Sequence, residues 1–260
     1  MPKHFPPGSG NLQLKIASIA VPPLGCGLGG LDWRDVKPLI EQAFAGVPAV
    51  QVVLFEPVGT PDAKAMPIGT KRPNLTPARA LFIKLMRQYS QMAYRLTLLE
   101  IQKLAYFLQE SGEPLRLNYV AHVYGPYAHN LNKVLETLDG HFIRGYGDSQ
   151  KPDVEIELLP GATDAADQFL AGHQGSADRL DRVAGVIDGF ETPYGMELLA
   201  SVHWVARHGS PAANDADEAV RAVHSWNDRK RRMFRPEHIR IAWNRLHEQG
   251  WLTPQATITR

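Results

Sequence analysis

The residues of this chain whose types and spacing suit chemistry begin with a glycine-rich loop. In the stretch SIAVPPLGCGLGGLDW (18–33), a short apolar segment leads into Gly25, Cys26, Gly27, Leu28, Gly29 and Gly30. Glycines allow positive φ and bring backbone N–H groups close to an anion, and a helix that follows adds its N-terminal dipole. The loop lacks the Gly-Lys-Ser/Thr of a P-loop and the spacing of a dinucleotide fingerprint. It therefore predicts either phosphate binding or a tight strand-to-helix turn.

Charged side chains are distributed unevenly, although the formal net charge is only +1. Residues 148–197 hold eleven Asp/Glu against three Lys/Arg, and residues 221–245 hold eight Lys/Arg against two Asp/Glu. The basic run 227–240, with Trp226 and Phe234, suggests nucleic-acid contacts, since cations bind phosphates and aromatic rings stack on bases. Solvated helix faces explain both regions equally well, and the overall charge argues against wholesale binding of nucleic acid or anionic membrane.

The glycine loop needs a strand before it and a helix after it. The apolar run 15–21 predicts a buried strand, and the run 50–55 predicts a second one. Asp32 or Asp35 can cap the helix between them, and Pro38, which suits only the first turn, favours Asp35. Strand, helix and strand form a βαβ unit with parallel strands. One such unit cannot cover both faces of its sheet, so we expect a fragment of an α/β domain.

The rest of the chain predicts a mainly helical domain. Residues 59–76 are rich in proline and glycine and indicate a linker. Thr76-Pro77 starts one helix, and Thr97 with Glu100 forms a capping box for the next. Further helices are expected at 128–140, 163–172, 176–189, 193–207, 215–225 and 236–249, with a hairpin from 141–147 and 154–159 and a turn at Tyr124–Tyr127. We expect an α+β protein with domains at 1–58 and 77–260, a solvated Lys103 and a packed His203.

Cys26 is the single cysteine, which excludes an internal disulfide and a Cys-based zinc site. No second His or Cys lies at metal-ligand spacing from His203, so we expect no metal and no cofactor. The start MPKHFPPGSG has no apolar signal core, and no apolar run approaches the length of a membrane span. We therefore expect a cytoplasmic protein without membrane contacts.

The stretch SIAVPPLGCGLGGLDWRDVKPLI (18–40) resembles the second ligand loop and following helix of macro domains, the modules that bind ADP-ribose. It is most similar to the DarG type, the antitoxin of the DarTG toxin–antitoxin pair. The resemblance implies that the loop Gly25–Gly30 wraps the diphosphate and distal ribose of ADP-ribose. It also implies the family's reaction, which is hydrolytic removal of ADP-ribose from DNA bases.

The resemblance covers only the closing part of a macro domain. The stretch MPKHF is similar in order to the family's catalytic stretch, which makes Lys3 the candidate catalytic residue. We therefore expect an N-terminally truncated protein with little or no glycohydrolase activity, because a flexible tail cannot position a lysine against the glycosidic carbon.

The second half carries its own resemblance. The stretches LEIQKLAYFLQ (99–109), YGPYAHNL (124–131) and FETPYGMELLASVHWVA (190–206) resemble the toxin-binding C-terminal domain of DarG, and the first two resemble the SocA/Panacea antitoxin domains. This implies a DarT-like toxin as the partner. Candidate toxin-binding residues are Tyr124, Tyr127, Asp153, Glu155, Glu157, Asp164 and Asp167, the five acids being suited to a positive DNA-binding groove of the toxin.

Three hypotheses follow. The first is an antitoxin that neutralises a DNA ADP-ribosyltransferase by binding it. The alternative is a DNA ADP-ribosyl glycohydrolase, with ADP-ribose or ADP-ribosylated DNA bound if the macro domain is completed. The second alternative is a winged-helix-like DNA-binding regulator, suggested by the basic run and by the helix 236–249 that ends in EQGWL.

Overall fold

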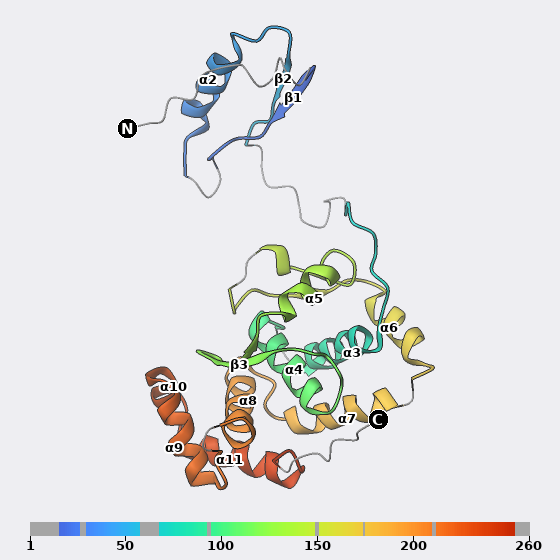
Figure 1. The fold of residues 1–260 in the computed structure, drawn as a ribbon, viewed down its shortest axis with the longest axis vertical. Helices are drawn as coiled ribbons and strands as arrows, with labels where there is room; N and C mark the ends of the chain where they lie inside the picture. The colour runs from blue at the N-terminus through green and yellow to red at the C-terminus, as the bar shows by residue number, and fades with distance from the viewer. Residues whose placement is uncertain are drawn as a thin grey trace. The chain divides into compact units, whose positions relative to one another are not determined.

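The computed structural model describes residues 16–26, 30–57, 68–92, 95–148, 151–173, 175–209 and 212–252. The chain forms two compact units, Met1–Pro67 and Ile68–Arg260. We call them the loop unit and the helical unit, and each is described by itself (Figure 1). Their elements together make an α+β protein that is mostly helical, as the sequence predicts.

The loop unit contains the predicted βαβ arrangement. Strand β1 (Ser18–Val21) pairs in parallel with β2 (Gln51–Leu54), with Ser18 opposite Gln51 and Val21 opposite Leu54, and helix α2 (Trp33–Phe44) connects them. Large apolar side chains stay exposed on this unit, among them Leu24, Leu31, Leu39, Val53 and Phe55. Two strands and one helix bury few of their own apolar groups, which is the physical reason for this exposure.

The start of α2 differs from the prediction. Asp32, not Asp35, is the N-cap, and its Oδ1 accepts a hydrogen bond from the Arg34 N–H at 2.8 Å. Pro38 therefore lies inside the helix. Proline there removes one backbone donor, but the cap satisfies an N–H at the helix start that otherwise lacks a partner. The position of the cap outweighed the preference of proline for the first turn.

The helical unit is built around two buried helices, α4 and α8 (Figure 1). Helices α3, α6 and α7 pack on the α4 side, and α9, α10 and α11 pack on the α8 side. The bounds are α3 (Pro77–Met92), α4 (Leu98–Glu110), α5 (Leu131–Leu138), α6 (Ala162–Leu170), α7 (Gly175–Ile187), α8 (Pro193–Arg207), α9 (Ala216–Trp226), α10 (Asp228–Met233) and α11 (Pro236–Glu248), with a short 3-10 helix η2 (Tyr146–Asp148). The expected helices are present, and α10 within the basic run is an addition.

Residues 68–76, at the end of the expected linker, pack on the helical unit. The Thr70 hydroxyl lies 2.8 Å from Nε2 of His141, and the Arg72 guanidinium lies 4.6 Å from the centre of the Phe142 ring. The rest of the expected linker, residues 59–67, lies outside the described residues.

Two short hairpins complete the helical unit. The predicted one is confirmed as β5 (Ile143–Arg144) paired antiparallel with β6 (Glu157–Leu158). The other consists of β3 (Tyr119–His122) and β4 (Gly125–Ala128), with Val123 and Tyr124 at its tip. The prediction of a turn over Tyr124–Tyr127 is therefore wrong for its last three residues. Pro126 is compatible with a strand here because a two-stranded sheet consists of edge strands.

His203 on α8 is packed in the core, as predicted. It is 1% exposed, its Nδ1 lies 2.7 Å from the Tyr106 hydroxyl, and its Nε2 lies 3.2 Å from the Trp251 carbonyl oxygen. The carbonyl only accepts, so Nε2 carries the proton and Nδ1 accepts from Tyr106. Burial lowers the pKa of His203 to about 4, so the ring is neutral near pH 7.

Within the described residues, no helix combines the length and the apolar character that crossing a membrane requires.

A buried carboxylate lies at the start of α4. Glu100 is fully buried and accepts hydrogen bonds from the Thr97 N–H at 2.7 Å, the Thr97 hydroxyl at 2.6 Å and the Tyr89 hydroxyl at 2.7 Å. This carboxylate ties α3 to the start of α4.

We predict that Glu100→Ala lowers the free energy of unfolding of the helical unit by about 2–4 kcal/mol, because it leaves three buried donors without an acceptor. Urea unfolding followed by circular dichroism measures this. Glu136→Ala, which removes an exposed carboxylate paired with Lys133, is the matched control and should change stability by less than about 0.5 kcal/mol. Equal effects of the two substitutions would contradict the role of Glu100.

Candidate functional site

The glycine loop lies where β1 ends and α2 begins. Gly25, Cys26 and Gly30 are within the described residues, and Gly27, Leu28 and Gly29 are outside them. The Leu31 N–H donates to the Gly25 carbonyl oxygen at 3.0 Å, and the Cys26 N–H donates to that of Pro23 at 3.1 Å. These two bonds fix both ends of a loop that leaves the carboxyl edge of a parallel strand, the edge at which α/β sheets bind their ligands.

Gly25 and Gly30 both need to be glycine. Their φ angles are +74° and +66°, a region that residues with a Cβ rarely adopt. A Cβ on Gly25 would also lie 2.6 Å from Cδ1 of Leu31. At both positions the backbone therefore takes a conformation that favours glycine.

The helix end beside the loop is negatively charged. The Asp32 carboxylate caps α2 and Asp35 lies in the first turn. Both acids offset the positive end of the helix dipole. The expected contribution of that dipole to anion binding is therefore reduced, and an anion at this site depends on the loop N–H groups themselves. Lys3, the candidate catalytic residue, lies outside the described residues.

In the helical unit, Tyr124 and Tyr127 lie on the β3–β4 hairpin. Both line a cavity of about 370 Å³, together with His122, His129 and Asn132. The Tyr127 hydroxyl accepts from Nδ2 of Asn132 at 3.3 Å. The Arg229 guanidinium lies 4.6 Å from the centre of the Tyr124 ring, in cation–π geometry. The structure thus brings the two tyrosines to one cavity and adds two histidines that the sequence did not single out.

A buried ionic cluster holds this hairpin. The Glu197 carboxylate on α8 is 1% exposed and accepts from Nζ of Lys230 at 2.8 Å and from Arg229, both on α10. Nζ of Lys230 also donates to the Ser201 hydroxyl at 2.9 Å, and Lys230 itself is fully buried. The cluster joins α8 to α10 with charge-assisted hydrogen bonds.

Lys103 belongs to the same interior region, and the prediction of a solvated side chain is wrong. It is 1% exposed, and its Nζ donates to the Pro126 carbonyl oxygen of β4 at 2.7 Å. Helix α4 carries apolar residues on all sides, a pattern that predicts a helix buried on every face. This pattern was the sequence signal that Lys103 is buried. Burial, and then the charge of Lys230, lower the pKa of Lys103 to about 7, while Glu197 opposes this shift.

The five acidic candidates are all exposed, but they do not form one cluster. Glu155 and Glu157 line a cleft of about 310 Å³ beside Arg87 and Arg95. Asp164 and Asp167 lie three residues apart on α6, where Asp167 pairs with Lys84 at 2.6 Å, and Asp153 lies between η2 and β6. Within the described residues, no group of three or more His, Cys, Asp or Glu side chains is placed to hold a metal ion.

We predict that Lys103 makes stability depend on pH. Between its folded pKa of about 7 and the value of about 10.4 in an unfolded chain, only the unfolded chain holds the proton. The free energy of unfolding therefore rises with pH across this window, by up to about 1.4 kcal/mol per pH unit. Lys103→Met should flatten this rise between pH 7 and pH 9 in urea unfolding series followed by circular dichroism.

The matched control for this prediction is Lys133→Met, which removes an exposed lysine and should keep the slope of the parent protein. A Lys103→Met slope equal to that of the parent protein would contradict a depressed pKa at Lys103.

No protein-family model matches the chain. The chain is 44% identical over 244 residues to a Thermus aquaticus protein named DNA ADP-ribosyl glycohydrolase, covering 94% of this chain and 66% of the relative. Proteins of the same name from Mycobacterium bovis and Mycobacterium tuberculosis are 39% identical over 251 residues, covering 90% of this chain and 69% of each relative. The chain spans about two thirds of the length of these relatives, and the matches include both units. This protein therefore belongs to the DNA ADP-ribosyl glycohydrolase family.

Proposed function

We propose that this protein binds ADP-ribose attached to DNA through the loop Gly25–Gly30 and takes part in its hydrolytic removal. The observation that carries this proposal is the loop itself, which leaves the end of a parallel strand with two glycines at positive φ. The name of the relatives, and a match of 94% of this chain to one of them, support the glycohydrolase hypothesis over the expectation of an inactive remnant.

The reaction breaks the bond between the ribose anomeric carbon and the DNA base. Water adds to that carbon, the base leaves with the electron pair, and a proton returns to the base. In this proposal the loop N–H groups bind the diphosphate and thereby hold the ribose in one orientation, which lowers the entropic cost of the attack. Lys3 is the proposed catalytic residue.

We predict that Gly25→Val abolishes ADP-ribose binding by isothermal titration calorimetry. Valine at φ near +74° is strained, and its Cβ would displace Leu31. The matched control is Gly46→Ala, because a Cβ on Gly46 meets no atom within 4 Å and this glycine follows α2 rather than the loop. Unfolding of the helical unit should be unchanged in both variants.

Release of ADP-ribose from an ADP-ribosylated oligonucleotide tests the second half of the proposal. The parent protein and Gly46→Ala should release it, and Gly25→Val and Lys3→Ala should not. Heat of binding without release would limit the protein to binding, and the absence of both would contradict the proposal.

A second function, neutralisation of a DarT-like toxin by the helical unit, is favoured by the exposed carboxylates. Asp153, Glu155, Glu157, Asp164 and Asp167 all face solvent, as a surface for a positively charged partner requires. Asp153, Glu157 and Asp164 make no ion pair with the residues that the structure describes, and we choose Glu157 and Asp164 among them for the test. Asp167 and Glu155 are partly neutralised by Lys84 and Arg95.

We predict that Glu157→Lys with Asp164→Lys weakens binding of such a toxin about tenfold or more and reduces the salt dependence of its affinity. Surface plasmon resonance at several salt concentrations measures both effects. Glu136→Lys on α5 also reverses an exposed charge and should leave the affinity unchanged. Affinity of the double variant equal to that of the parent protein at every salt concentration would contradict the assignment.

A further inference from the structure

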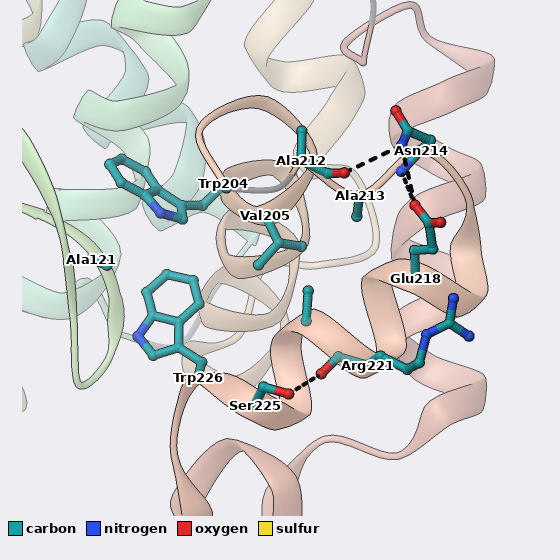
Figure 2. Close-up of a pocket in the computed structure, with 12 residues that line it drawn as sticks. Ala121, Trp204, Val205, Ala212, Ala213, Asn214, Glu218, Arg221, Ser225 and Trp226 are labelled. Atoms are coloured by element: carbon teal, nitrogen blue, oxygen red, sulfur yellow. Dashed lines mark hydrogen bonds between the residues drawn. The ribbon is translucent and has the colours of Figure 1, made fainter.

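The β3–β4 hairpin has a cavity on each flank. One, of about 680 Å³, is lined by Ala121 of β3, Trp204 of α8, and Arg221 and Trp226 of α9 (Figure 2). The other is the cavity of about 370 Å³ that contains His122, Tyr124 and Tyr127. Both volumes lie within the range of about 300–1,000 Å³ that is typical of ligand sites.

Aromatic side chains line part of both cavities. Figure 2 shows the indoles of Trp204 and Trp226 side by side near Ala121, with ring centres 6.5 Å apart and planes inclined by 50°. Both side chains are partly exposed. On the hairpin, the rings of His122 and Tyr127 lie 5.1 Å apart. Planar rings of this kind offer faces on which nucleobases of any sequence stack.

The exposed cation that lines the larger cavity is the Arg221 guanidinium. It makes no ion pair with the residues that the structure describes. Glu218, which also lines the larger cavity, already accepts from the N–H and Nδ2 of Asn214 at 2.8 and 3.2 Å (Figure 2).

The surface around the tip of the hairpin lies between the two cavities, which are on opposite faces because His122 and Tyr127 alternate with Ala121 in the strand register. Nδ2 of Asn227, between α9 and α10, donates to the Val123 carbonyl oxygen at 3.3 Å. Arg229, two residues further along, stacks on Tyr124. Phe234, which the sequence suggested as a second stacking residue, is 1% exposed and is excluded from this role. We call the surface the hairpin band: His122, Tyr124, Tyr127, Trp204, Trp226 and Arg221.

We propose that the hairpin band binds unmodified single-stranded DNA. Proteins of this binding class combine aromatic stacking platforms with cations that contact the phosphate backbone, and the band supplies both. An apolar protein segment would leave the Arg221 guanidinium without a partner, so the charge favours a polyanion. The inference goes beyond the proposed hydrolysis, because it needs no ADP-ribose and lies on the other unit.

The test uses the full chain and an unmodified, dye-labelled oligothymidylate of twelve nucleotides. Fluorescence anisotropy should show saturable binding at 50 mM salt that weakens at 200 mM salt. Trp226→Leu, which removes a stacking face, should weaken binding about tenfold or more. Arg221→Glu should weaken it by a similar factor and flatten the salt dependence. Arg87→Glu, an exposed arginine of α3 outside the band, is the matched control and should bind as the parent protein does.

Absence of binding to the oligonucleotide by the folded parent protein would overturn the proposal and leave the band to a protein partner. Binding unaffected by Arg221→Glu, a surface change that cannot unfold the core, would also overturn it. Equal affinity for duplex DNA of the same length would do so too, since stacking requires unpaired bases. Loss of ADP-ribose heat in Gly25→Val reports on the loop, and loss of oligonucleotide binding in Arg221→Glu reports on the band, so the failure of either proposal is distinguishable from the failure of the other.

Discussion

The hairpin surface depends on one buried carboxylate. Glu197 is 1% exposed and is the acceptor for both Lys230 and Arg229, so α10 packs on α8 through charge-assisted hydrogen bonds. Removing the cations would leave a buried carboxylate unpaired and lower the stability of the fold by several kcal/mol. Removing the carboxylate would leave buried positive charge unpaired, with a similar loss of stability. This mutual requirement fixes the basic segment after Trp226 and places Arg229 over the ring of Tyr124. The position of the aromatic and basic side chains on the surface therefore follows from a contact in the interior.

Polar groups of α4 bind the hairpin through β4. Gln102 donates from Nε2 to the Ala128 carbonyl oxygen at 3.2 Å and accepts the Ala128 N–H at Oε1 at 3.1 Å, so its amide pairs with β4 as a neighbouring strand would. Lys103 donates to Pro126 on the same strand. A two-stranded sheet is marginal by itself, and these side chains satisfy backbone groups that face the protein interior. Buried polar groups thus position the hairpin, and burial lowers the pKa of one of them, Lys103, to about 7.

The two units differ in how their apolar residues are used. The main hydrophobic core consists of residues of the helical unit alone, from Ala80 to Trp251. The loop unit buries only a few apolar side chains, such as Val21 and Ile40, and exposes others, such as Leu39 and Phe55. Its loop geometry comes from local backbone constraints at Gly25 and Gly30 rather than from a large core.

The sequence by itself determined the features that depend on neighbours along the chain. The βαβ unit, the glycine loop, the start of α3 at Thr76-Pro77 and the pairing of Thr97 with Glu100 are all local patterns of capping, periodicity and backbone freedom.

Only the tertiary structure decided the features that depend on contacts between distant segments. In the sequence, Lys103 and Lys230 have the pattern of ordinary surface lysines. In the structure both are buried, and each donates to a distant partner: Lys103 to Pro126, 23 residues away along the chain, and Lys230 to Glu197, 33 residues away. The strand at Gly125–Ala128 pairs with Tyr119–His122, and Gln102 of α4 bonds to its last residue, a contact that no local spacing predicts. Burial and long-range pairing are properties of the packed chain, so their electrostatic consequences appear only when the fold is known.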